Sequence, residues 1–245
     1  LVQQMREINT GDPDTLKEFI VRSMQTYPAD HYALVLWDHG AGWRAPAVDS
    51  PVTRGVSYDD TSFGDGLDMA DLYAAMNAIT GGGAAPLDLL GMDACLMAMI
   101  EVDNQLIPFA DVRVGSEETE PFFGWPFDSI LGDLVADPAM PAETLGIKIV
   151  DYYYAWYGYD ETPSALRLGG EYAALNAAVD AFAGALIANG AAHIAGIETA
   201  RNTVQEFTYP EYVDLWHLAD LIAANVSNTA IDNAAAAVKT AVEAA

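Results

Sequence analysis

The sequence predicts an α/β fold in which a mostly parallel sheet is covered by helices on both faces. Two short apolar runs, residues 32–38 and 87–93, have the pattern of strands that are buried on both faces. Further short runs at 112–116 and 164–168 predict a third and a fourth strand. Segments with apolar residues at helical spacing separate these runs, and that alternation is typical of a parallel sheet.

The first half of the chain is predicted from its start and stop signals. Asp12 has the properties of an N-cap, and Pro at the next position favours a helix over residues 13–27. Residues 44–66 contain several Pro and Gly breaks among many Asp, Ser and Thr residues, so we expect a loop there. Asp68 caps a second predicted helix, which three glycines end at residues 81–83.

The second half of the chain is mostly helical by its periodicity. We expect an apolar helix over 96–106, directly behind Cys95. Residues 117–128 are rich in acids and aromatics and predict a loop. An amphipathic helix is expected over 141–157, and from Glu171 onward the pattern is helical.

We expect two parts in the chain. Its 245 residues suffice for one sizeable core or two small ones. The strands all fall within residues 1–170, and residues 171–245 are predicted to form a helical part packed on that domain. Residues 1–10 lack the layout of a signal peptide, and the chain starts with Leu1, so we expect the N-terminal part of the protein to be missing.

The charge excludes several classes of partner. Asp and Glu number 36 against 10 Lys and Arg, and the formal net charge is -26. The basic residues are scattered, whereas a nucleic-acid or anionic-membrane partner requires them to cluster. We find no apolar run of the roughly 18 residues that a membrane-spanning helix needs. The expectation is therefore no nucleic acid and no membrane-spanning segment.

Two strand ends carry candidate chemistry. In an open parallel sheet, active residues gather beyond the carboxyl ends of the strands. One predicted strand leads into His39 and Gly40, and the other leads into Cys95, the only cysteine of the chain. A nearby imidazole promotes formation of the nucleophilic thiolate. The N–H groups of Gly40 and Cys95 are then candidates for an oxyanion hole, and a helix starting after Cys95 is expected to lower the thiol pKa.

Four segments resemble the clostripain (C11) family of cysteine peptidases. They are residues 11–13, 32–43, 87–97 and 116–121. The resemblance implies a caspase-like three-layer α/β/α sandwich and endopeptidase activity with His39 and Cys95 as the catalytic dyad. It also implies that Asp93 lines the S1 pocket and that cleavage follows Arg or Lys. Many relatives are secreted and some use calcium, so we expect a secreted or extracellular protein, with calcium as a candidate cofactor.

The sequence departs from the family in two places. Relatives usually carry two further strands before residues 11–13, so we expect the sheet of this chain to lack its first strands and the catalytic domain to be N-terminally incomplete. Relatives often have Gly and a small or acidic residue before Gly124, where this chain has Phe122 and Phe123. Aromatic side chains there would narrow or dry the S1 pocket. Asp93 also has a structural interpretation, as a cap of the helix behind Cys95.

Other acidic residues have both a functional and a structural interpretation. Glu117, Glu118 and Glu120 either line a cationic subsite, with Phe123 beside it, or form an exposed acidic loop. Residues 59–66 do not match the EF-hand pattern, so a solvated turn is favoured over a calcium loop and we predict no metal ligands. Arg44 and a second arginine within 44–66 make that segment a candidate for self-cleavage.

The sequence therefore favours a cysteine endopeptidase that acts on peptides or proteins. The alternative is a caspase-like fold kept as a catalytically inactive binding or scaffold module, which would have no need of both His39 and Cys95. A metal hydrolase that uses Asp38, His39 and Asp93 is a distant third, because a second His at ligand spacing is missing.

Overall fold

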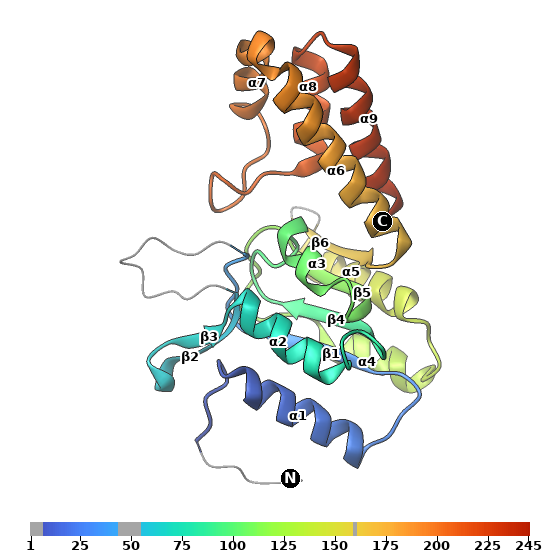
Figure 1. Ribbon diagram of the computed structural model, residues 1–245. Helices are drawn as coiled ribbons and strands as arrows, with labels where there is room; N and C mark the ends of the chain where they lie inside the picture. Colours follow the sequence, from blue (N-terminus) through green and yellow to red (C-terminus); the bar gives the residue numbers. More distant parts are fainter. Residues whose placement is uncertain (1–6, 44–54, 159–160) are drawn as a thin grey trace. The chain divides into compact units, whose positions relative to one another are not determined.

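The computed structural model describes residues 7–43, 55–158 and 161–245. It divides into two compact units, Leu1–Leu166 and Arg167–Ala245 (Figure 1). Each unit has its own buried apolar cluster. The strands that end at the candidate dyad belong to the first unit.

The first unit is built on a four-stranded sheet. Its order is β1 (Ala33–Trp37), β4 (Leu87–Asp93), β5 (Ala110–Ser116) and β6 (Pro163–Arg167). The pairs β1–β4 and β4–β5 are parallel, so the α/β prediction is confirmed. β1 lies at one edge of the sheet, and β4, whose residues are almost all buried, lies in its interior.

Helices cover both faces of this sheet (Figure 1). On one face lie α1 (Pro13–Thr26), α2 (Met69–Ile79) and α3 (Ile100–Leu106), and on the other lie α4 (Phe127–Ala136) and α5 (Ala142–Tyr157). The predicted caps hold, because Asp12 accepts a hydrogen bond from Asp14 N–H and Asp68 forms a capping box with Asp71. The sequence pattern does not predict α4, a short helix without a side-chain cap.

The face of the sheet that α4 and α5 cover carries a buried apolar cluster. Leu89, Val112 and Val114 of the sheet pack against buried residues of α4 and α5. Trp125 joins this cluster, because its indole lies over Gly91, where a Cβ would be 2.8 Å from a ring carbon. Alternation along β4 places Asp93 on the same face as Leu89 and Gly91.

Two local expectations are wrong. The described part of 44–66 is not all loop, because β2 (Val56–Asp59), a 3-10 turn (Asp60–Ser62) and β3 (Asp65–Leu67) form an antiparallel hairpin. Asp59 closes its turn by accepting from the N–H groups of Thr61 and Ser62. The helix expected over 96–106 begins only at Ile100.

The second unit is helical, as predicted. It contains α6 (Gly170–Asn189), a 3-10 turn (Gly190–His193), α7 (Ile194–Arg201), α8 (Leu215–Asn225) and α9 (Thr229–Ala244). The division into domains at residue 170 stays a prediction. Within the described chain, the helical stretch Gly170–Arg201 is long and apolar enough to cross a membrane by length and composition, and 17% of its most apolar window is buried. The expected lack of a membrane-spanning segment therefore also stays a prediction.

Candidate active site

The carboxyl ends of β1 and β4 lie side by side. Trp37 pairs with Asp93 in the parallel ladder, and the Asp38 N–H donates to the Asp93 carbonyl at 3.3 Å. His39 follows directly and is exposed, while Cys95 lies two residues beyond Asp93 and is partly buried. The register therefore brings the segments that carry the imidazole and the thiol to the same edge of the sheet.

Gly40 brings the chain after His39 against the backbone of Cys95. A Cβ at position 40 would lie 2.2 Å from the Cys95 carbonyl oxygen and 3.1 Å from its amide nitrogen. Only glycine fits this approach without moving the chain. The Ala41 N–H is bonded at 3.0 Å to the Gly55 carbonyl, next to the bridge between Gly40 and Val56, and this contact anchors the segment to the β2–β3 hairpin.

Cys95 lies in a tight turn rather than at the start of a helix. Leu96 has φ of 62°, a left-handed conformation that costs a non-glycine residue about 1–2 kcal/mol. Two backbone bonds hold the turn, from the Leu96 N–H to the Glu118 carbonyl at 3.2 Å and from the Ala98 N–H to the Ser116 carbonyl at 2.9 Å. The expected effect of a helix dipole on the thiol is therefore wrong, because α3 starts five residues later than Cys95.

The thiol is instead in contact with the loop after β5. The Glu120 N–H donates to the Cys95 Sγ at 3.2 Å, and the sulfur lies 4.0 Å from the Glu120 carbonyl oxygen. The loop after β5, and not a helix terminus, therefore contacts the sulfur of Cys95.

Asp93 is buried beneath the same loop. Its side chain is 3% exposed, and its Oδ2 accepts a hydrogen bond from the Trp125 N–H at 3.0 Å. It does not cap the helix behind Cys95, so that structural interpretation is wrong. Burial raises the pKa of the Asp93 carboxyl, and its hydrogen bonds from Trp125 and Glu120 oppose that rise.

Glu120 provides a second buried carboxyl next to Asp93. Its Oε2 accepts from the Trp125 Nε1 at 3.2 Å, whereas its Oε1 is buried and accepts no hydrogen bond within the described ranges. Burial and the hydrogen bond to Asp93 raise the pKa of Glu120 to about 10. The two buried carboxyls therefore hold a proton between them near neutral pH.

The loop over this pair is fixed by close packing. Gly124 has φ of 64°, and a Cβ there would lie 2.6 Å from the Asp93 Oδ2 and 2.8 Å from the Trp37 Nε1. The Tyr157 hydroxyl donates to the Gly124 carbonyl at 2.7 Å. Tyr153 is fully buried, and its hydroxyl has no hydrogen-bond partner among the described residues. The loop is thus held from the sheet below and from α5.

The remaining predicted site residues surround this loop. Glu118 is tied down, since its N–H donates to Thr162 at 2.9 Å and its carboxylate accepts from the Thr119 N–H at 2.7 Å. Glu117 is half-buried. Phe122 and Phe123 are 86% and 83% exposed and contact each other edge to face with ring centroids 6.0 Å apart. The two rings therefore project from the loop instead of filling the space above Asp93.

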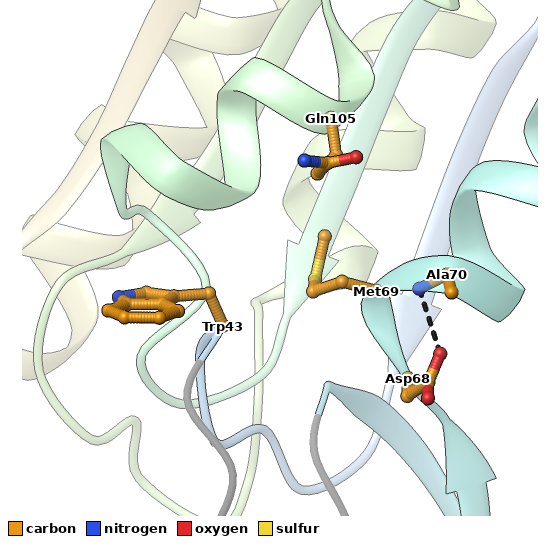
Figure 2. Close-up of a pocket in the computed structure, with 5 residues that line it drawn as sticks. All are labelled: Trp43, Asp68, Met69, Ala70 and Gln105. Carbon is orange, nitrogen blue, oxygen red and sulfur yellow. Dashed lines mark hydrogen bonds between the residues drawn. The ribbon is translucent and has the colours of Figure 1, made fainter.

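A separate pocket lies on the α2–α3 side of the first unit (Figure 2). Its volume is about 290 Å³, and it is lined by Trp43, Asp68, Met69, Ala70 and Gln105. Oδ1 of Asp68 accepts hydrogen bonds from the N–H groups of Ala70 and Asp71, so this side chain is the N-cap of α2. None of the residues that line this pocket belongs to the candidate dyad.

The described residues provide neither a metal site nor most of the segment in which self-cleavage is predicted. In the described ranges, no group of three or more His, Cys, Asp or Glu side chains is placed to hold a metal ion. The Asp59 carboxylate accepts hydrogen bonds from the N–H groups of Thr10, Thr61 and Ser62, and these bonds lower the pKa of Asp59 well below the usual range. Calcium dependence stays a prediction. Arg44 and Arg54 lie outside the described residues.

Comparison with known proteins identifies the family. The model of the clostripain family, Peptidase C11, matches residues 1–244. The chain belongs to the clostripain family. Its identity to clostripain of Hathewaya histolytica is 32% over 135 residues, which cover 53% of this chain and 26% of that protein.

Solved structures of the clostripain family share the fold. A secreted C11 cysteine protease from Bacteroides thetaiotaomicron, in complex with an irreversible peptide inhibitor, aligns with a TM-score of 0.71 at 22% identity. An inactive zymogen C11 protease from Parabacteroides distasonis aligns with a TM-score of 0.66 at 23% identity. These alignments cover 99% and 100% of this chain, and the chain spans 64% and 62% of those proteins. The caspase-like α/β/α prediction is therefore confirmed.

Proposed function

We propose that this protein is a cysteine endopeptidase in which Cys95 is the nucleophile and His39 is the general base. The observation that carries the proposal is the parallel register of β1 and β4, which brings both segments to one sheet edge in a chain of the clostripain family. The relative from Bacteroides thetaiotaomicron is a secreted protease, and we extend that location to this protein.

The geometry supports a covalent mechanism of acyl transfer. His39 takes the proton of the Cys95 thiol, and the N–H of Glu120 stabilises the thiolate that remains. The thiolate attacks the carbonyl carbon of the scissile peptide bond, and the N–H groups of Gly40 and Cys95, whose backbones are in contact, bind the resulting oxyanion. His39 then protonates the leaving amine, and water hydrolyses the thioester.

We further propose that the S1 pocket takes Arg or Lys. Asp93 lies on the face of β4 toward the loop of residues 117–126, and a buried carboxylate attracts a cationic side chain strongly. The half-buried Glu117 and Glu118 add negative charge to the same loop, and Phe123 lines its outer side. Both phenylalanine rings project from the loop, whereas Gly124 and Trp125 cover Asp93, so a P1 side chain reaches this carboxylate only when the loop shifts.

The dyad is tested by substitution with a matched control. Cys95→Ala and His39→Ala are each expected to abolish hydrolysis of fluorogenic peptides, whether or not calcium is added, and to leave the circular dichroism spectrum unchanged. His31→Ala removes an exposed imidazole that pairs with Asp88 at 2.7 Å, and it is expected to keep full activity. Near-normal activity of either dyad variant would refute the assignment.

Thiol labelling separates the peptidase from an inactive binding module. Iodoacetamide at neutral pH should alkylate Cys95 faster than a free thiol, and His39→Ala should slow this reaction. Labelling at the rate of a free thiol in wild type, together with absence of peptide hydrolysis, would favour the module.

The P1 preference is tested on matched peptides that end in Arg, Lys, Leu or Phe. We expect Asp93→Asn to lower kcat/KM for Arg about 10-fold or more, the size of a lost charge-assisted contact, with little change for Leu. A wild-type preference for Leu or Phe would refute basic specificity. Equal losses on all four peptides would mean that Asp93 is structural.

A further inference from the structure

His39 is held by its backbone and not by its side chain. The imidazole is exposed, and within the described ranges it takes part in no hydrogen bond or ion pair. The base of a nucleophile–base pair is usually oriented by a third group, which binds its second ring nitrogen. Because no described group contacts His39 in this way, the direction of its ring depends on how firmly the neighbouring residues fix the chain.

The chain directly after His39 is attached to the β2–β3 hairpin by its backbone. Gly40 forms a bridge with Val56, and the Ala41 N–H donates to the Gly55 carbonyl at 3.0 Å. Gly55 has φ of 99°, and a Cβ there would lie 1.9 Å from a backbone oxygen of β3, so this position requires glycine. The hairpin is therefore closely packed at the place where it meets the His39 segment.

Asp38 attaches the chain before His39 to the same hairpin. Its Oδ2 accepts a hydrogen bond from the Tyr58 N–H at 2.6 Å, whereas its own N–H donates to the Asp93 carbonyl at 3.3 Å. A hydrogen bond to a carboxylate is roughly twice as strong as one between neutral groups. The contact of the Asp38 carboxylate is therefore stronger than the backbone contacts on either side of His39.

The hairpin is distorted at the position that meets Asp38. The ladder between β2 and β3 is irregular between Val56 and Tyr58, and Ser57 has φ of 64°. A non-glycine residue keeps this conformation only where surrounding contacts determine it, and irregularities of this kind concentrate next to active sites. The contacts on either side of the distortion are those that hold the His39 segment.

We propose that Asp38 is a positioning residue for His39. Its carboxylate, bound to the Tyr58 N–H, ties the His39 segment to the β2–β3 hairpin and thereby keeps the imidazole within reach of the Cys95 sulfur. This inference rests on the proposed dyad of Cys95 and His39. The role requires an acceptor oxygen at this place rather than a negative charge, because the partner is a neutral N–H group.

Three substitutions separate the hydrogen bond from the charge. Asp38→Ala removes both, Asp38→Asn keeps an acceptor oxygen without the charge, and Asp38→Glu keeps the charge but moves the acceptor by one methylene group. Asp214→Ala is the matched control, because Asp214 is also half-buried and accepts a backbone N–H, that of His217, at 2.7 Å. It lies at the start of α8 in the second unit.

The experiment measures two properties of each variant. One is kcat and KM for the peptide that wild type cleaves fastest. The other is the rate at which iodoacetamide alkylates Cys95 between pH 6 and 8, with His39→Ala as the reference for a lost imidazole. Urea unfolding confirms that each rate refers to folded protein.

Asp38→Ala should lower kcat about 10- to 100-fold with KM within about 3-fold of wild type, because a displaced base slows the chemical step without weakening substrate binding. Its alkylation rate should fall toward that of His39→Ala. Asp38→Glu should lose kcat in the same way, whereas Asp38→Asn should recover kcat to within about 5-fold of wild type. Asp214→Ala should match wild type in both measurements.

The possible failures are distinguishable. Wild-type kcat and alkylation in Asp38→Ala would overturn the inference, even if that variant were less stable. So would an Asp38→Asn variant as impaired as Asp38→Ala. If Asp38→Ala does not fold, an active Asp38→Glu beside an impaired Asp38→Asn overturns the inference equally, because the charge and not the hydrogen bond would then be required.

Alkylation separates this inference from the proposed function, because it requires no peptide hydrolysis. If wild type cleaves no peptide but Asp38→Ala and His39→Ala both slow the alkylation of Cys95, the inference stands and the proposed function falls. Alkylation of wild type at the rate of His39→Ala would overturn the positioning role and the dyad together.

Discussion

Two of the buried aspartates of the first unit, Asp103 and Asp93, have partners of opposite kinds. One pairs with a cation and the other with a second carboxyl. Asp103 meets Arg113 in a forked ion pair, with Nε to Oδ1 at 2.7 Å and Nη2 to Oδ2 at 2.6 Å, and both side chains are 1% exposed. Arg113 also donates to the Ser164 hydroxyl at 3.1 Å. Asp93, equally buried, faces the carboxyl of Glu120 instead of a cation.

The difference separates a buried ion pair from a buried carboxyl pair that depends on a bound proton. The Asp103–Arg113 pair satisfies itself, and it links α3 to β5 and, through Ser164, to β6. The Asp93–Glu120 pair holds a proton between its carboxyls, and the Glu120 N–H contacts the sulfur of Cys95. Carboxyls with a strongly shifted pKa are concentrated at functional sites.

The largest expected effect is the loss of stability when the Asp103–Arg113 ion pair is broken. Asp103→Ala leaves the Arg113 guanidinium charged and buried, and it should lower the free energy of unfolding by about 3–5 kcal/mol. Urea unfolding followed by tryptophan fluorescence measures this loss. Replacing both partners, as Asp103→Leu with Arg113→Met, should cost much less. A loss below about 1 kcal/mol for the single variant would place this pair among the weak surface pairs and remove the contrast.

The contribution of the Asp93–Glu120 pair to the free energy of unfolding should decrease as the pH rises, whereas that of an acidic group with a lowered pKa increases. The pKa of Glu120 is about 10 in the folded protein and ordinarily 4.5, so between these values the folded state holds the additional proton. Wild type therefore loses stability as the pH rises through this range. Glu120→Gln lacks this loss, and its stability relative to wild type should increase by up to about 1.4 kcal/mol per pH unit.

Urea unfolding of both proteins at pH 6, 7, 8 and 9 measures that difference. Because both chains carry nearly the same remaining charges, their difference removes the general effect of the net charge of -26. A difference that stays constant over the four pH values would show that Glu120 is ionised in the folded protein.

The smallest effect is expected at the exposed aromatic pair. Phe123→Ala should lower kcat/KM about 3- to 10-fold for substrates with large apolar residues near the scissile bond, because their contact with the ring is lost. Stability should change by less than about 0.5 kcal/mol, since the ring is 83% exposed. Phe63→Ala, on the β2–β3 hairpin, removes a fully exposed ring and should leave hydrolysis of all substrates unaffected. Identical kinetics of both variants would exclude Phe123 from the substrate path.

The sequence predicted those parts of the site that depend on local pattern. Residues 33–37 and 87–93 have the apolar pattern of buried strands, and parallel pairing then places the segments of His39 and Cys95 at one edge. Asp12 and Asp68 cap their helices as their sequence contexts predict.

The parts that escaped prediction depend on contacts between distant segments. The turn at Cys95 is held by carbonyls of Ser116 and Glu118, and these bonds, invisible in the local pattern, delay the helix to Ile100. The sequence placed Glu120 in an acidic loop, but only folding shows that its carboxyl turns inward to Asp93. The local sequence pattern does not distinguish a buried carboxylate from an exposed one.

Hydrolysis of one P1-Arg peptide and its P1-Leu counterpart by wild type, His39→Ala and His31→Ala tests the central claim, that residues at the ends of β1 and β4 form a cysteine peptidase site, most directly. The account predicts that wild type and His31→Ala cleave at least one of the two peptides at the same rate, and that His39→Ala cleaves neither. Equal hydrolysis by His39→Ala and wild type would contradict it.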